Sequence, residues 1–130
     1  MQNTTAGLLA MLANLIAGCL EGAKVGLFTG TPTLSLNSQI SDFAEPLYTG
    51  YARKPITWNP VFVNSGGQVQ VDSGLMQFQP SSGTPSDLVT GFFVTDSAGT
   101  TLLFAGVLAT PVSFVSAKDA VPVVVQYTMG

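Results

Sequence analysis

Residues 87–108 read DLVTGFFVTDSAGTTLLFAGVL, and this stretch decides the fold class. Two runs rich in apolar, β-branched and aromatic residues, 87–95 and 100–108, flank residues 96–99, whose sequence DSAG is typical of a hairpin turn. We therefore predict two antiparallel strands joined by a tight turn. Because side chains alternate along a strand, the adjacent Phe92 and Phe93 point to opposite faces. One ring enters the core, and the other enters either a second buried layer or an interface patch.

The alternation of strands and turns extends over most of the chain. Short runs that favour strands are separated by Gly, Pro, Ser and Asn, which mark turns. Besides the two hairpin strands, the predicted strands are residues 24–29, 51–58, 61–63, 68–72, 75–79, 111–115 and 121–128. Pro55 indicates an edge position or a bulge in its strand. About eight short strands with this spacing predict an all-β fold, a jelly-roll-like β-sandwich.

Residues 6–20 carry a helical pattern instead. Apolar residues recur there at three- and four-residue spacing, Thr4 or Thr5 can cap the start, and Gly18 or Gly22 can end the helix. The remaining side of the helix is small and uncharged, so it has no clear solvent face. The helix therefore either lies across the sandwich or packs against a neighbouring subunit, and both can hold.

The predicted organisation is an N-terminal helical segment over residues 1–22 and a β-sandwich domain over residues 23–130. The apolar run has the length of a signal peptide, and residues 16–19 resemble a lipoprotein cleavage box. However, no Lys or Arg precedes Lys24, so the positive region of a signal peptide is missing. We expect a retained structural helix, too short and interrupted to span a membrane.

Charge is scarce in this chain. It has four basic and seven acidic residues and no histidine, so 8% of its residues are charged against about 25% in ordinary soluble domains. A globule of 13.5 kDa exposes roughly 6,500 Å², so each charge serves about 600 Å² of surface. The rest of the surface is either uncharged and polar or covered by other subunits. The composition therefore favours part of an assembly.

The few ionisable residues do not form a recognisable catalytic or ligand-binding motif. Without histidine, Ser–His and Cys–His catalysis are excluded, and the single Cys19 excludes an intrachain disulfide or a cysteine zinc site. The cations are scattered, which argues against nucleic acid as a partner. Isolated carboxylates beside turn residues are expected to accept local backbone hydrogen bonds. These carboxylates are Asp42, Glu45, Asp72, Asp87, Asp96 and Asp119. We expect no catalytic residue, no metal and no cofactor.

Tyr48, Tyr51 and Trp58 lie close together in the sequence. They could form a platform on which a sugar ring stacks. The alternative, which we favour, is that Tyr51 and Trp58 pack in the core while Arg53 stacks or pairs with a nearby carboxylate.

Four stretches together resemble a group of small β-rich bacteriophage virion proteins, which begin with a short helix. The stretches are residues 25–29 (VGLFT), 48–53 (YTGYAR), 91–100 (GFFVTDSAGT) and 102–106 (LLFAG). The resemblance spans most of residues 20–128, although each piece is short and generic for a β-sandwich. It implies a fixed turn with an anchoring arginine at Gly50, Tyr51 and Arg53, and a close backbone approach at Gly91.

The resemblance further implies a non-enzymatic virion protein, in particular a capsid decoration or cement protein. Its partners would be the major capsid protein and copies of itself in a small homo-oligomer such as a trimer, with no nucleic acid and no membrane. The candidate interface residues are Leu8, Leu12, Leu15, Phe92 and Phe93. The alternative is a tail or fibre module that binds a host glycan through Tyr48, Tyr51 and Trp58. The sequence leaves head and tail locations open.

Overall fold

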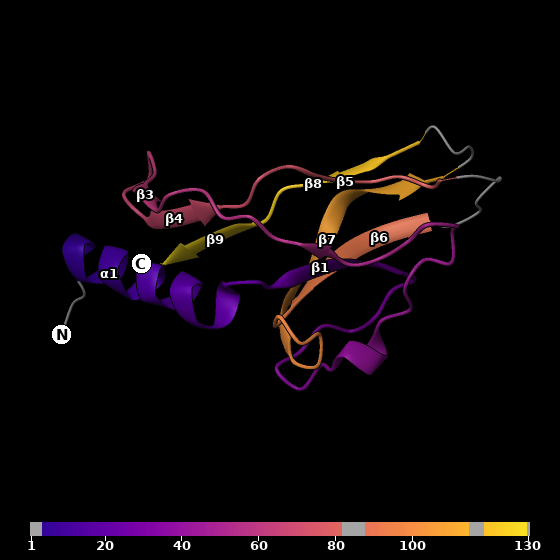
Figure 1. Ribbon diagram of the computed structural model, residues 1–130, viewed down its shortest axis with the longest axis horizontal. Coiled ribbons are helices and arrows are strands. Elements are labelled where there is room, and N and C mark those ends of the chain that lie inside the picture. The colour runs from indigo at the N-terminus through magenta and orange to yellow at the C-terminus, as the bar shows by residue number, and fades with distance from the viewer. Residues whose placement is uncertain (1–3, 82–87, 115–118, 130) are drawn as a thin grey trace.

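The fold is mostly antiparallel β-sheet with one N-terminal helix, which confirms the coarse fold prediction (Figure 1). The computed structural model describes residues 4–81, 88–114 and 119–129. Within these residues the helices are α1 (Thr5–Leu15), a π-helical turn (Ile16–Leu20) and a 3₁₀ turn (Ile40–Asp42). The strands are β1 (Lys24–Thr29), β2 (Lys54–Pro55), β3 (Phe62–Val63), β4 (Val69–Asp72), β5 (Met76–Phe78), β6 (Leu88–Thr95), β7 (Leu102–Ser113), β8 (Val121–Val123) and β9 (Gln126–Met129).

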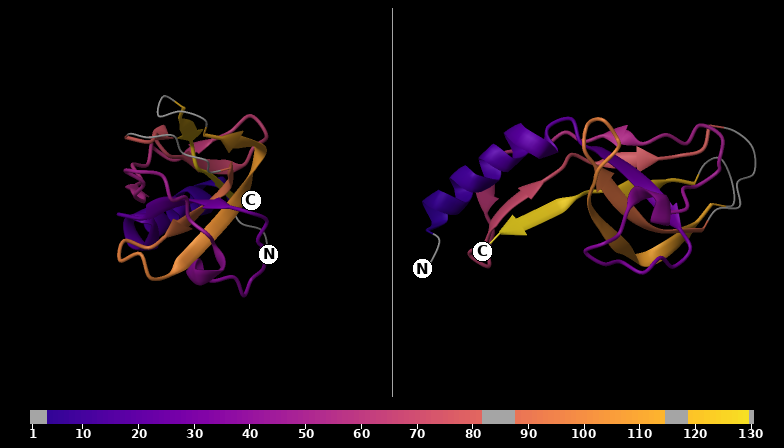
Figure 2. Two further views of the ribbon diagram at one scale, coloured as in Figure 1. Left: turned by 90° about the vertical axis from the view of Figure 1, so that its right-hand side faces the viewer. Right: turned by 90° about the horizontal axis from the view of Figure 1, so that it is seen from below.

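The chain is elongated and has two lobes (Figure 2). The larger lobe holds the four-stranded sheet β2-β1-β6-β7 and the two-stranded sheet β5-β8. The smaller lobe holds α1 and the three-stranded sheet β3-β4-β9. The accessible surface is 7411 Å², against roughly 6,500 Å² expected for one compact globule of this mass. The excess agrees with a division into two lobes.

The predicted hairpin is present as β6 and β7. The turn residue Asp96 donates its N–H to Thr101, and Gly99, at φ +75°, donates its N–H to Asp96. The predicted strands 100–108 and 111–115 are parts of the single strand β7, which passes Pro111 because an edge strand tolerates a missing N–H. Two predicted end residues, Asp87 and Val115, lie outside the described residues.

Three glycines of this sheet each lie beneath a phenylalanine of the neighbouring strand. Gly91 pairs with Phe28, Gly26 with Phe93, and Gly106 with Phe92. In each pair a Cβ on the glycine would overlap or crowd the ring. The close approach expected at Gly91 is therefore present, because the ring occupies the space that a side chain would need.

The main core lies between the two sheets of the larger lobe. It joins Val25 and Leu27 of β1 to Phe78 of β5 and Val121 of β8, all of them buried. Phe92 is half-buried at the margin of this core. The inward-facing apolar side chains of these strands therefore form one shared core.

The opposite face of β1 and β6 is also buried. Phe43, which follows the 3₁₀ turn, stacks between Phe28 and Phe93 with ring centroids 5.0 and 5.1 Å away. The segment between β1 and β2 therefore covers this face as a third layer. Of the two sequence alternatives for the adjacent phenylalanines, the second buried layer is the one present.

The strand predicted over residues 121–128 is divided between two sheets. β8 pairs with β5 and β9 pairs with β4, so β4–β5 and β8–β9 form one bent antiparallel ribbon. The bend occurs where Val125 donates its N–H to the buried Ser73 hydroxyl (2.8 Å) and accepts from the Ser73 N–H (2.9 Å). One added residue on the β4–β5 side shifts the register there, and this bulge carries the ribbon from one lobe to the other.

The smaller lobe forms where α1 lies on β4. Leu8 and Leu12 pack against Val69 and Val71, and the Thr4 hydroxyl caps the helix by accepting from the Gly7 N–H at 3.0 Å. The expected cap is therefore confirmed. The helix does not end at Gly18, since a π-helical turn continues it to Leu20.

Trp58 joins the two lobes. Its ring contacts both apolar clusters, and its indole N–H donates to the Leu20 carbonyl at 3.0 Å. Next to it, the Gly74 N–H donates to the Thr57 carbonyl at 2.7 Å. The end of the helix is thereby held to the Trp58 side chain, and the bend of the ribbon is held to the backbone of the preceding residue, Thr57.

Candidate functional site

Ionisable side chains meet in one network on the larger lobe. Arg53 donates two hydrogen bonds to the Glu45 carboxylate, from Nε at 3.0 Å and from a terminal nitrogen at 3.1 Å. Its other terminal nitrogen donates to the Gly99 carbonyl at 3.2 Å in the hairpin turn. The guanidinium also lies 5.2 Å from the centre of the Phe93 ring. The prediction that Arg53 stacks or pairs with a nearby carboxylate is therefore confirmed, and both interactions are present.

Tyr51 connects this ion pair to the sheet. Its hydroxyl donates to Glu45 at 2.7 Å and accepts from the backbone N–H of Leu27 at 3.1 Å. Gly50, at φ +89°, makes the turn just before Tyr51, as the resemblance implied. The network therefore stands at the outer edge of β1, where β2 has ended.

The electrostatics of the network stabilise one protonation state. Partial burial by itself would raise the pKa of Glu45, but the hydrogen bonds from Arg53 and Tyr51 and the arginine charge outweigh burial and lower it. Burial raises the pKa of Tyr51, and the neighbouring Glu45 raises it further. The hydrogen bond to Glu45 raises the pKa of Arg53. At neutral pH the three groups are therefore a carboxylate, a neutral phenol and a cation.

This arrangement is suited to holding a loop on the sheet. Each polar atom of the carboxylate and the phenol faces a partner within the chain, so the site fastens the 45–53 segment to β1 and to the hairpin turn. The interactions are partly solvent-exposed, with side-chain exposures of 24% for Arg53 and 30% for Glu45, so solvent weakens the ion pair.

The prediction that the carboxylates accept local backbone hydrogen bonds holds for two of them, whereas Glu45 and Asp72 accept from side chains, Asp72 from the Gln70 amide at 2.6 Å. Asp96 accepts from the N–H groups of Thr100 (2.9 Å) and Thr101 (3.2 Å), and these bonds lower its pKa. Asp42 accepts from the Gln39 N–H at 2.8 Å and caps the 3₁₀ turn. Among the described residues no group of three or more His, Cys, Asp or Glu side chains is placed to hold a metal.

The aromatic platform does not form as a free surface. Tyr48 is 6% exposed and packs edge-on against Tyr51 and Phe114. Tyr51 is committed to the network, and Trp58 to the joint between the lobes. The three residues thus have packing roles, as the favoured alternative expected.

The predicted interface residues are mostly interior. Leu12 and Phe93 are fully buried and Leu8 is 9% exposed, while Leu15 and Phe92 are half-buried at cluster margins. This corrects the sequence prediction for Leu8, Leu12 and Phe93, because β4 and the Phe43 layer already cover them. An interface on α1 would have to use its other side, where Met11 is exposed.

The exposed apolar residues are a different set, which no sequence pattern marks as an interface. They are Met11, Leu34, Leu36, Leu47, Phe62, Val63, Leu75, Leu88, Val107 and Val124. The only sequence signal for Leu36 and Leu47 is an adjoining turn-forming residue, Asn37 and Pro46 respectively, outside any predicted strand. Leu36 is as exposed as in an extended peptide, and Leu47 is 92% exposed.

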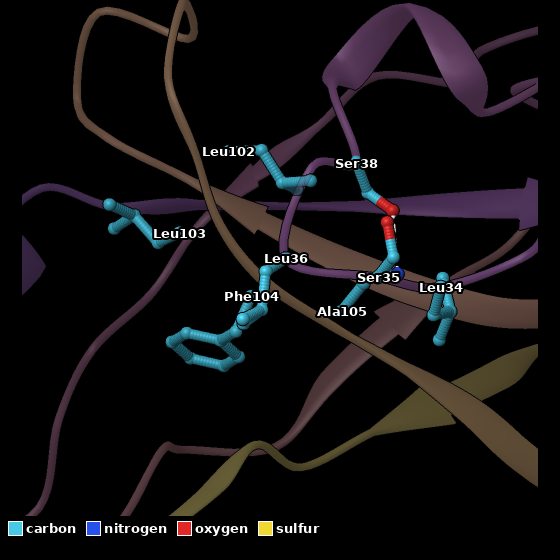
Figure 3. Close-up of a pocket in the computed structure, with 8 residues that line it drawn as sticks. All are labelled: Leu34, Ser35, Leu36, Ser38, Leu102, Leu103, Phe104 and Ala105. Carbon is cyan, nitrogen blue, oxygen red and sulfur yellow. Dashed lines mark hydrogen bonds between the residues drawn. The ribbon is translucent and has the colours of Figure 1, made fainter.

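An apolar pocket of about 500 Å³ lies beside the start of β7 (Figure 3). The 34–38 segment forms one wall, where Ser35 donates its N–H to the Ser38 hydroxyl at 2.9 Å. Four consecutive residues of β7 form the other wall. The lining residues are Leu34, Ser35, Leu36, Ser38, Leu102, Leu103, Phe104 and Ala105. The pocket has no charged side chain.

Comparisons with protein-family models, curated proteins and solved structures find no match to this chain. Among the described helices, none is both long and apolar enough to cross a membrane.

Proposed function

We propose that this chain is a structural protein of a bacteriophage virion, specifically a capsid decoration or cement protein. It would bind the major capsid protein and other copies of itself at junctions of the shell, without catalysis or a cofactor. Two observations support the proposal: the sequence resemblance and, in the structure, large apolar side chains on an almost uncharged surface. The second observation carries it.

The exposed side chains supply the free energy for such contacts. Burying a fully exposed leucine contributes roughly 1.5–3 kcal/mol, so Leu36 and Leu47 are strong candidates for covered residues, and Leu75, at 62% exposure, is a weaker one. Single exposed apolar residues are ordinary on monomers. Here they occur on a chain with four basic and seven acidic residues, so few charges have to lose water when a neighbour packs closely.

The elongated form also suits a protein that bridges neighbouring subunits. The smaller lobe extends from the sandwich, and α1 carries no charged residue (Figure 2). A body of this form can contact two subunits at once, which is the requirement for a cement protein.

The jelly-roll form of the sandwich is the finer fold prediction that we retain with this proposal. Its support is that β1 and β6 share a core with β5 and β8 from a second sheet. The tail alternative depends on a glycan contact through Tyr48, Tyr51 and Trp58. These side chains pack within the chain, which does not favour that contact. We therefore propose the head location alone.

The test compares particles with and without the protein. Particles from a phage whose gene for this chain is deleted should release their genome at a lower temperature than complete particles. Adding the purified chain back should restore the release temperature. Equal release temperatures in all three samples would contradict a cement role.

A further inference from the structure

The two edges of the main sheet differ. At the β1 edge, the Leu27 N–H donates to the Tyr51 hydroxyl and the Thr29 N–H to the Ala44 carbonyl (2.8 Å), so side chains and loop backbone continue the bonding beyond β2. At the other edge, β7 pairs with β6 and with no described strand on its outer side. An edge strand with unpaired backbone groups is a template for another strand.

The ladder shows which backbone groups of the sheet point outward. Leu27 directs its N–H to Tyr51, away from β6, so the next residue Phe28 directs its groups toward β6. Phe28 pairs with Gly91, which therefore faces β1. By the same alternation the following residue, Phe92, faces β7.

On β7 the partner of Phe92 is Gly106, so the N–H and C=O of Gly106 point to β6. The neighbours Ala105 and Val107 consequently direct their N–H and C=O groups outward. No described residue bonds to these outward groups. Val107 also has a side chain that is 66% exposed.

The side chains along this edge, like its unpaired backbone groups, favour pairing with another strand. β7 reads LLFAGVLATPVS and contains no charged residue, so it lacks the charges that keep edge strands apart, and its two register shifts and Pro111 lie outside residues 104–107. The apolar pocket lies against the first part of the strand, with Leu34 and Leu36 as its outer wall (Figure 3). An extended apolar segment could therefore form a ladder with β7 and cover the pocket.

We propose that the occupant is a second copy of this chain, with the two β7 strands antiparallel about a two-fold axis at Gly106. In this register Ala105 faces the partner subunit's Val107, and Val107 faces the partner subunit's Ala105. Each of these two pairs exchanges both N–H···O bonds. β7 keeps one register with β6 over residues 104–107 and the ladder shifts on both sides of this segment, so the paired stretch is short and centres on Ala105, Gly106 and Val107. Pro111, which has no N–H to donate, lies outside it.

A copy of the chain fits this edge for two reasons. Neither β7 nor the 34–38 segment carries a charge, so two copies that pair through these segments bring no charges of the same sign together. The partner subunit's Val107 also arrives beside Ala105, at the pocket wall, where its exposed side chain is covered. The proposal concerns the chain by itself, so its failure would leave the virion proposal standing.

Sedimentation of the purified chain and its variants tests the pairing. The unmodified chain should form a dimer that dissociates on dilution. Val107→Lys and Val107→Glu should each weaken the dimer about tenfold or more, and their mixture should restore it, because the diagonal residues then carry opposite charges. Val63→Lys, at a side chain of 45% exposure on β3, is the matched control and should leave the dimer unchanged.

Hydrogen exchange of the unmodified chain gives a second readout that requires no substitution. The amides of Ala105 and Val107 should become protected as concentration rises, whereas the amide of Gly106, bonded within the sheet, should be protected throughout. A chain that is monomeric at every concentration overturns the proposal. So does a trimer, a Val107→Lys dimer as strong as the original, or exchange at Ala105 and Val107 that is independent of concentration.

Discussion

The ring of Phe28 on β1 lies over Gly91 on β6, where a Cβ at Gly91 would overlap it. The Gly106 carbonyl would lie 2.5 Å from the same Cβ, so neither side of the glycine can yield easily. Close packing of this kind links the Phe28–Phe43–Phe93 layer to the backbone of the sheet.

Gly91→Ala should therefore destabilise the fold by about 1–3 kcal/mol, since overpacking forces the ring and the strand apart. The matched control is Gly18→Ala, where a Cβ would meet no atom within 4 Å. That change should be neutral or stabilising by up to about 1 kcal/mol. Urea unfolding of both variants provides the measurement, and equal midpoints would show that the ring does not occupy this space in solution.

Arg53→Ala should cost about 1–2 kcal/mol of unfolding free energy. It removes the two bonds to Glu45 and the contact with the Phe93 ring, both weakened by partial exposure. Lys24→Ala is the control on the same sheet. A double-mutant cycle with Glu45→Gln should give a favourable coupling energy, and a coupling of zero would contradict the network.

The network also makes stability depend on acid. Because the folded pKa of Glu45 is below its ordinary value of 4.5, its contribution is present above that value and is lost as pH falls through the folded pKa. The stability difference between the original chain and Glu45→Gln should therefore shrink on acidification. Asp96 titrates in both proteins, so its effect cancels. A difference that stays constant from neutral pH to strong acid would refute this role of Glu45.

Leu12 and Met11 provide a test of how α1 lies. Leu12 is fully buried against β4, so Leu12→Ala should remove about 2–5 kcal/mol of packing and speed hydrogen exchange throughout α1. Met11 is 49% exposed, and Met11→Ala should change stability by less than about 0.5 kcal/mol. The rate of hydrogen exchange in β6 should change less than in α1 in both variants, because β6 belongs to the other lobe. If the two variants behave alike, the helix does not lie on β4 as described.

Elements with local causes could be predicted from the sequence. β1 has the predicted bounds because its apolar run ends in residues that favour turns, and the β6–β7 turn forms because Asp96 bonds to its own following backbone. The core roles of Tyr51 and Trp58 were also predicted, since aromatic rings beside few charges favour burial.

Elements that depend on distant partners could not be predicted. The 121–128 strand breaks because of a bulge opposite Ser73, and the expected 51–58 strand shrinks to β2 because Tyr51 completes the edge with its side chain. For the same reason the sequence placed Leu12 in an interface: a helix that is apolar on one side looks identical whether its own β4 or another subunit covers it.

The central claim is that this chain is a repeated part of a virus shell. Quantitative mass spectrometry of purified particles, with the major capsid protein as the internal reference, tests it most directly. The account predicts the chain in hundreds of copies per particle, as a decoration protein requires. A few to a dozen copies would place it in the tail instead, and its absence from particles would contradict the virion role altogether.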